Sequence, residues 1–212
     1  MNVRIAALFV ASLAIAACGS APDESLVEGS SDLTSKAPSK RQSLETFSCP
    51  KGKSEIRVAF YDADSTLRVS KKNSVTASAI DDVDVLPFAA RSVKADHDAG
   101  YLVAIVSNQG GVGSGKTKYE VAEGGLRTTA EKLGKLGAKI DYFDFAEDDD
   151  EFRKPEAGMA TRLSGFVEEK CGRGIDIAHS KMIGDSGYKE GEDGPHPDGR
   201  PADDFSHADR LF

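Results

Sequence analysis

A short apolar run that ends in two closely spaced carboxylates constrains this chain more than any other stretch of its sequence. Residues 56–61 are predicted to form a buried strand, and Asp62 and Asp64 follow it directly. Parallel α/β sheets bind their ligands at the carboxyl ends of the strands. Adjacent carboxylates repel each other unless a cation or a shared proton relieves the repulsion. The pattern therefore predicts either a cation-dependent site or a solvated turn after the strand.

From residue 56 onward, apolar segments of strand length alternate with amphipathic segments of helix length in this 212-residue chain. Such alternation predicts an α/β fold, with a parallel sheet that carries helices on both faces. The expected strands are residues 56–61, 101–106, 140–145 and 181–183, and the expected helices are residues 87–99, 116–136 and 155–171. Gly124 and Gly125 weaken the middle of the second helix, and residues 68–86 are expected to form an irregular excursion.

Residues 1–17 have the composition of a targeting segment. Arg4 precedes an apolar run that is too short to span a bilayer stably, as in the core of a signal peptide. The small residues before Cys18 resemble the lipobox of bacterial lipoproteins. This resemblance implies cleavage before Cys18, a lipid group on its sulfur, and anchoring to the bacterial cell envelope on the periplasmic side, with Gly19 favouring the outer membrane. An ordinary secretory signal with an incidental cysteine is the alternative.

The rest of the chain divides into a tether and a folded domain. Residues 18–55 are rich in Ser, Pro, Lys and Glu, a composition typical of a flexible linker. The folded domain is predicted over residues 56–212. Besides Cys18, the chain contains Cys49 and Cys171, which in an oxidising compartment form either one disulfide or two separate thiols. The sequence does not decide between them, because it does not give the distance between their Cα atoms.

Polar groups lie beyond the end of each of the four predicted strands. They are Asp62, Asp64 and Thr66 after the first, Ser107 and Asn108 after the second, Lys154 after the third, and Asp185 after the fourth. Parallel strands bring these groups to one edge of the sheet. The set contains carboxylates for a hard cation, a hydroxyl and backbone amides for phosphate oxygens, and a lysine for charge. Together these groups predict a phosphoryl-transfer site.

The order of these motifs resembles that of the haloacid dehalogenase (HAD) superfamily of phosphatases. Four segments resemble the 3′-phosphatase module of the polynucleotide kinase 3′-phosphatases: residues 62–67, 106–116, 152–159 and 204–212. The histidinol-phosphatase and heptose-bisphosphate phosphatase branch shares much of the middle. The resemblance covers residues 56–212 and implies a HAD-like, three-layer Rossmannoid sheet. The short segment between the first two strands leaves no room there for a large cap domain.

The resemblance also implies a role for each matched residue. Asp62 would be the nucleophile, and Asp64 would protonate the leaving group and then deprotonate the hydrolytic water. Mg²⁺ would be held by Asp62, the carbonyl of Asp64, and Asp185. The implied phosphate-binding set is Asp62, Thr66, Ser107, Asn108 and Lys154, of which Ser107 and Lys154 would contact the transferred phosphoryl group. Glu190 and Asp193 are candidate further acids around the metal.

Two other classes of function compete with a phosphatase. Residues 110–117 satisfy the G-x-x-x-x-G-K-[ST] pattern of a nucleotide-binding P-loop, with Lys116 as its lysine, and this predicts a kinase or NTPase. Against this alternative, the expected catalytic acid on a second strand is missing unless Asp141 or Asp144 serves. A non-catalytic binding lipoprotein is the third class. The acidic residues 147–151 are expected to be a solvated loop, with metal binding as the alternative.

The charge of the chain bears on its substrate. A net charge of −8 argues against a general polyanion-binding surface, because affinity for nucleic acid depends on cationic contacts. A site without a large cap is open enough to admit a bulky phosphate ester, such as a DNA 3′ end. The expected substrates are thus phosphate monoesters, with a polynucleotide 3′ end as one hypothesis and a nucleotide or sugar phosphate as the other.

Overall fold

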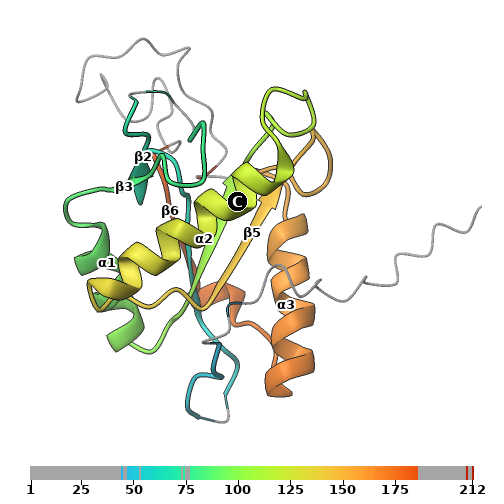
Figure 1. The fold of residues 1–212 in the computed structure, drawn as a ribbon. Coiled ribbons are helices and arrows are strands. Elements are labelled where there is room, and N and C mark those ends of the chain that lie inside the picture. The colour runs from blue at the N-terminus through green and yellow to red at the C-terminus, as the bar shows by residue number, and fades with distance from the viewer. Residues whose placement is uncertain are drawn as a thin grey trace, which may run out of the picture. The chain divides into compact units, whose positions relative to one another are not determined.

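A four-stranded parallel sheet forms the centre of the domain, in the order β5-β4-β1-β6 (Figure 1). The computed structural model describes residues 44, 47–52, 54–72, 74, 77–185, 209 and 212. The strands of the sheet are β1 (Val58–Tyr61), β4 (Leu102–Asn108), β5 (Tyr142–Ala146) and β6 (Lys181–Ile183). Strand β1 is central and pairs in parallel with β4 on one side and with β6 on the other.

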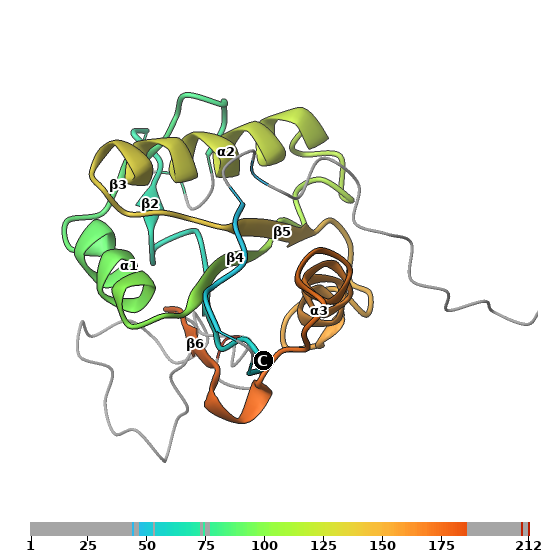
Figure 2. The same cartoon turned by 90° about the horizontal axis from the view of Figure 1, so that it is seen from below.

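Helices cover both faces of this sheet (Figure 2). Helices α1 (Ala89–Asp98) and α2 (Tyr119–Lys135) pack on one face, where Val93 and Leu126 meet Ile105 of the sheet. Helix α3 (Gly158–Cys171) packs on the other face, against Phe60 and Val106. A 3₁₀ helix, η1 (Ile177–His179), precedes β6. The predicted α/β class, with helices on both faces of a parallel sheet, is confirmed.

The excursion between β1 and α1 is more regular than expected. It contains two short strands, β2 (Arg68–Val69) and β3 (Asp84–Val85), which pair antiparallel to each other. The expectation of an irregular segment was therefore wrong for these residues, since a two-residue strand leaves no periodic pattern in a sequence. The described part of this excursion is a small flap rather than a large cap.

All three α-helices begin later than expected, and α1 starts at Ala89 rather than at 87. Helix α2 starts at Tyr119 rather than at 116, because the preceding loop closes on itself through the Thr117 N–H, which donates to the Gly111 carbonyl at 2.8 Å. Helix α3 starts at Gly158 rather than at 155. Pro155 follows a cis peptide bond, and the Gly158 N–H donates to the Glu151 carbonyl across a turn. Pro155 therefore belongs to this turn instead of opening the helix.

Residues upstream of 56 are attached to the domain. We call residues 44 and 47–52 the strap. Leu44 packs beside the α1–α2 core, the ring of Phe47 meets that of Phe166 at 4.7 Å, and Cys49 forms a disulfide with Cys171 at the end of α3. Ordered packing thus begins before residue 56, inside the stretch expected to be a tether. Of the two alternatives for these cysteines, the structure contains the disulfide.

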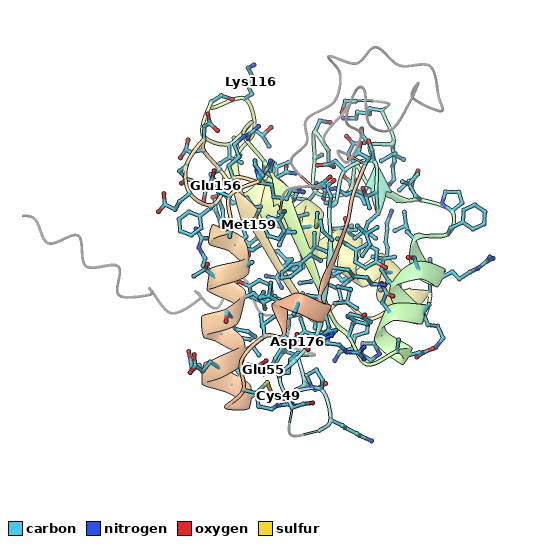
Figure 3. All side chains as sticks on the ribbon, turned by 180° about the vertical axis from the view of Figure 1, so that it is seen from behind. Cys49, Glu55, Lys116, Glu156, Met159 and Asp176 are labelled. Carbon is cyan, nitrogen blue, oxygen red and sulfur yellow. A yellow bond between two sulfur atoms is a disulfide. The ribbon has the colours of Figure 1, made fainter. Side chains whose placement is uncertain are left out.

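Contacts of Arg173 hold the strap in place next to the disulfide. The guanidinium donates to the backbone carbonyls of Pro50, Gly52 and Ser54. Figure 3 shows Cys49 and Glu55 at one end of the molecule's sheet and Lys116 and Glu156 at the other. The strap therefore lies at the amino ends of the strands.

Replacing Cys171 with serine is expected to lower the free energy of unfolding by about 2–5 kcal/mol, because the disulfide closes a long loop in the unfolded chain. The sequence separation of the two cysteines is 122 residues. Urea unfolding of the two proteins measures the difference. A reductant should destabilise the wild type and leave a Cys49→Ser/Cys171→Ser double variant unchanged. Equal stability of the oxidised wild type and the double variant would contradict the prediction.

The expected signal peptide, residues 1–17, and the lipidation site Cys18 lie outside the described residues. Within the described part of the chain, no helix has both the length and the apolar character needed to cross a membrane.

Candidate active site

The candidate site lies at the carboxyl edge of the sheet, where β1, β4 and β6 end together. Tyr61 is in register with Ile105 of β4 and with Ile183 of β6. The next residue, Asp62, donates its backbone N–H to the Ile183 carbonyl at 2.9 Å. This register places Asp62 in the centre of the edge. The parallel topology assembles the site as predicted, because each strand delivers its terminal residue to the same place.

Three carboxylates meet at this edge. One ligand oxygen from each of Asp62, Asp185 and Asp209 lies within 4.8 Å of the other two. Lys154 joins the group, since its Nζ donates to Asp62 Oδ1 at 2.7 Å and to Asp209 Oδ1 at 2.5 Å. The Lys154 side chain is almost fully buried, with 3% of the residue exposed. Charge partners of this kind compensate the burial of the Lys154 ammonium.

Burial dominates the electrostatics of Asp62. It raises the pKa of this carboxyl to about 7, because the charged form is poorly solvated there; Lys154 opposes the shift, and Asp209 adds to it. A cation bound by the three carboxylates would act in the same direction as Lys154 and favour the charged form. Asp62 is therefore placed where an anion is costly without positive charge beside it.

Asp64 points toward the flap and not toward Lys154. Its Oδ1 accepts from Arg68 Nε at 2.8 Å, and its Oδ2 accepts from Gln109 Nε2 at 2.7 Å. Gln109 also donates to Ser107 Oγ at 2.8 Å. Because the Ser107 oxygen accepts this bond, its hydroxyl hydrogen remains to donate to a phosphate oxygen. Gln109 therefore links the predicted acid–base residue to the predicted phosphate-binding serine.

The turn between Asp62 and Arg68 closes tightly around Ala63. The backbone N–H groups of Leu67 and Arg68 both donate to the Ala63 carbonyl, and the Ser65 N–H donates to the Arg68 carbonyl. Ser65 adopts the left-handed conformation with φ of 63°, which favours glycine. Thr66 Oγ1 is buried and makes no hydrogen bond within the described residues. This supports its predicted contact with a phosphate oxygen, which stays a prediction.

Asn108 holds the main chain of Lys154. Its Oδ1 accepts from the Lys154 N–H at 2.9 Å, and its Nδ2 donates to the Lys154 carbonyl at 3.1 Å. Both ends of the amide are therefore engaged by Lys154, and in the structure Asn108 positions the lysine. A direct contact between Asn108 and phosphate stays a prediction.

The glycine-rich loop, residues 110–117, does not have the geometry of a P-loop. A P-loop wraps phosphate with backbone N–H groups that point into the loop, and a helix follows it at once. Here the N–H groups of five residues donate to carbonyls of the loop or its neighbours: Val112, Gly113, Ser114, Gly115 and Thr117. An added Cβ at Gly113 would lie 1.8 Å from Asp148 Oδ1, so the acidic loop packs against this segment. The structure does not favour nucleotide binding there.

Several site residues were not identified from the sequence. Arg68 and Gln109 were assigned no role, and Asp209 appeared only within a segment that carries the family resemblance. The signal for Asp209 was weak, because a long segment, residues 186–208, separates it from Asp185 in the sequence. The same segment lies outside the described residues. Glu190 and Asp193, the candidates for further acids, lie in that segment. Among the described residues, Asp209 completes the acidic group instead.

A family model and known proteins resemble this chain. The model described as polynucleotide kinase 3 phosphatase matches residues 57–212. A 20.8 kDa protein from the FGF-VUBI intergenic region of Autographa californica nuclear polyhedrosis virus is 29% identical over 170 residues, covering 80% of this chain and 84% of that protein.

Two solved structures were matched to this chain. A HAD-like phosphatase from Mesorhizobium loti superposes with a TM-score of 0.57 at 19% identity, covering 68% of each chain. The D,D-heptose 1,7-bisphosphate phosphatase from B. bronchiseptica, crystallised with magnesium and phosphate, has a TM-score of 0.44 at 18% identity, covering 51% of this chain and 62% of that one. The first supports a HAD-like fold.

Proposed function

This chain belongs to the polynucleotide kinase 3 phosphatase family and is a phosphatase, and we propose that it hydrolyses phosphate monoesters through a covalent phosphate on Asp62. The observation that carries this proposal is the group formed by Asp62, Lys154, Asp185 and Asp209 at one edge of the sheet. A carboxylate nucleophile, a buried lysine and further acids are the parts that this chemistry requires.

The residues at this edge fit a magnesium ion. Asp62, Asp185 and Asp209 offer three carboxylate oxygens close together, which are the ligands that a hard divalent cation prefers. Three carboxylates face one cation, Lys154, so a phosphate dianion would meet net negative charge. Mg²⁺ held by these acids would offset that charge and polarise the phosphoryl group. Coordination by the Asp64 carbonyl remains part of the proposal.

The side chains supply the steps of hydrolysis. An Asp62 oxygen attacks phosphorus, the bond from phosphorus to the ester oxygen breaks, and Asp64 gives its proton to the departing alkoxide. Water then attacks the phosphoryl group on Asp62 and loses a proton to Asp64, so that inorganic phosphate leaves and both carboxyls return to their starting states. Lys154 and the Ser107 hydroxyl bind the phosphoryl oxygens during both transfers.

A polynucleotide 3′ end is the substrate that the family suggests, and nucleotide or sugar phosphates are the alternative. The described part of the flap is small, which supports access by a bulky ester. The net charge of −8 favours small substrates over a long polyanion. A phosphatase that recovers phosphate from extracellular nucleic-acid ends would satisfy both observations.

The location follows from the amino-terminal segment. We propose that Cys18 is lipidated and that the protein is anchored to the bacterial cell envelope, on its periplasmic side and in the outer membrane. The Cys49–Cys171 disulfide supports an oxidising compartment. Metabolic labelling with palmitate should mark the wild type and not a Cys18→Ser variant, and equal labelling of both would contradict lipidation.

A substrate panel tests the proposed function. Phosphate release is measured from a 3′-phosphorylated oligonucleotide, nucleoside monophosphates, sugar phosphates and an aryl phosphate, with Mg²⁺ and with a chelator. We expect turnover that depends on Mg²⁺ and the highest kcat/KM for the oligonucleotide. If the oligonucleotide is the poorest substrate, the polynucleotide assignment fails. Undiminished turnover in the chelator would contradict the metal assignment.

A further inference from the structure

Arg68 is a deeply buried charged residue near the proposed site, with 1% of the residue exposed. It forms a two-point contact with Asp64: Nε lies 2.8 Å from Oδ1, and Nη2 lies 3.4 Å from Oδ2. A guanidinium excluded from water must be compensated by such partners. Its planar fork also fixes the orientation of the carboxyl that it meets.

Helix α2 makes room for this guanidinium. Nη1 of Arg68 donates to Thr129 Oγ1 at 3.4 Å, and that hydroxyl donates to the Gly125 carbonyl at 2.8 Å. An added Cβ at Gly125 would lie 3.1 Å from the same Nη1 atom. Gly125, which weakens the helix, therefore lets the Arg68 guanidinium lie against α2. The backbone of Arg68 is held as well, since it belongs to β2.

The hydrogen bonds of Asp64 are unevenly distributed between its two oxygens. Oδ2 accepts from Arg68 and from Gln109, whereas among the described residues Oδ1 accepts only from Arg68 Nε. Each carboxylate oxygen has about two acceptor positions. Oδ1 therefore has one acceptor position left, and from this position a proton can pass to another group.

We propose that Arg68 is a positioning residue for Asp64. Held by Thr129 of α2, and with space left by Gly125, it orients the Asp64 carboxyl so that Oδ1 faces the leaving oxygen of the substrate. This inference rests on the proposed function, in which Asp64 protonates that oxygen as the bond from phosphorus breaks. Through Arg68, the flap and α2 would thus influence proton transfer by Asp64 at the end of β1.

Esters with different leaving groups distinguish a positioning role of Arg68 from a general structural role. Good leaving groups such as p-nitrophenolate need little protonation, whereas an alkoxide needs a proton from Asp64. We therefore compare kcat/KM for p-nitrophenyl phosphate and for an alkyl phosphate in the wild type and in Arg68→Met. The ratio kcat/KM reports only the steps up to phosphorylation of Asp62. Hydrolysis of the phosphorylated Asp62, which is the same step for both esters, therefore does not affect it.

We expect Arg68→Met to lose on the order of 10²-fold in kcat/KM for the alkyl ester, which lies within the usual contribution of a general acid. The loss for the aryl ester should be less than about 10-fold, since that ester depends little on the acid. Arg68→Lys keeps the charge but not the two-point contact, and we expect it to fall between the wild type and Arg68→Met. Equal losses for the two esters would overturn the proposal.

A second pair of variants covers the case in which Arg68→Met does not fold. Gly125→Ala places a methyl group against Nη1 of Arg68. The methyl group of Gly134→Ala, in the same helix, meets no described atom within 4 Å. We expect Gly125→Ala to lower the alkyl-to-aryl ratio several-fold and Gly134→Ala to leave it at the wild-type value. Identical ratios in the two alanine variants would overturn the proposal.

The wild type is measured first in both experiments. If it turns over neither ester, the proposed function fails, and this inference fails with it. If it turns over both and the ratio does not change in the variants, this inference alone fails.

Discussion

Asp62→Asn is expected to reduce turnover of every phosphate monoester by on the order of 10⁴-fold or more, as removal of a catalytic nucleophile usually does. An amide cannot take the place of the carboxylate that attacks phosphorus. The substitution keeps the size of the side chain, and burial already penalises the charge of Asp62, whose pKa it raises to about 7. We therefore expect the melting temperature to remain close to that of the wild type.

Acid quenching during turnover of a ³²P-labelled ester should leave label on the wild type and none on Asp62→Asn. Asp98→Asn provides a matched control, because Asp98 is an exposed acid at the end of α1 that pairs with Lys94. It should retain wild-type turnover. A burst of product from Asp62→Asn would contradict the assigned nucleophile.

Asp209→Asn is expected to have the second largest effect, although no role for this residue was apparent from the sequence. Asp209 contributes one of the three grouped carboxylates and also contacts Lys154. Loss of a charged ligand should raise the Mg²⁺ concentration for half-maximal activity by at least about 10-fold, comparable to the loss of a residue that orients a metal ligand. It should also reduce the increase in melting temperature that Mg²⁺ produces.

Titrating Mg²⁺ against both readouts tests this prediction, with Asp98→Asn again as the control. If Asp209 acts only by holding Lys154, Asp209→Asn will lower turnover and leave the Mg²⁺ midpoint unchanged. That outcome would remove Asp209 from the metal site and keep it as a partner of the lysine.

The sequence predicted the features that depend on local pattern. Apolar runs identified the four parallel strands, since a buried strand is continuously apolar, and alternation with helices predicted the layers. Topology then implied that Asp62, Lys154 and Asp185 would meet, which they do. The boundaries were less accurate, as at Pro155, because a hydrogen bond across the turn, from the Gly158 N–H to the Glu151 carbonyl, decides where α3 begins.

The features that were missed depend on contacts between distant segments. Gly125 looked like a weakness in α2, and only the position of Arg68 explains it, because a side chain on α2 at that place would meet the guanidinium. Gln109 is uncharged and lies in a glycine-rich segment, so nothing in the sequence connected it with Asp64. These contacts are set by how the flap packs on α2, which no periodic pattern encodes.

The strap lies at the end of the domain that is opposite to the catalytic edge. Leu44 lies near Ile140, just before β5 begins, and Cys49 is joined to the last residue of α3. The 14 residues of α3 span about 20 Å between that end and the catalytic edge. With the lipid anchor that we propose at Cys18, the chain would enter the domain at the end opposite to Asp62, which favours dissolved esters over phosphate groups of the membrane as substrates.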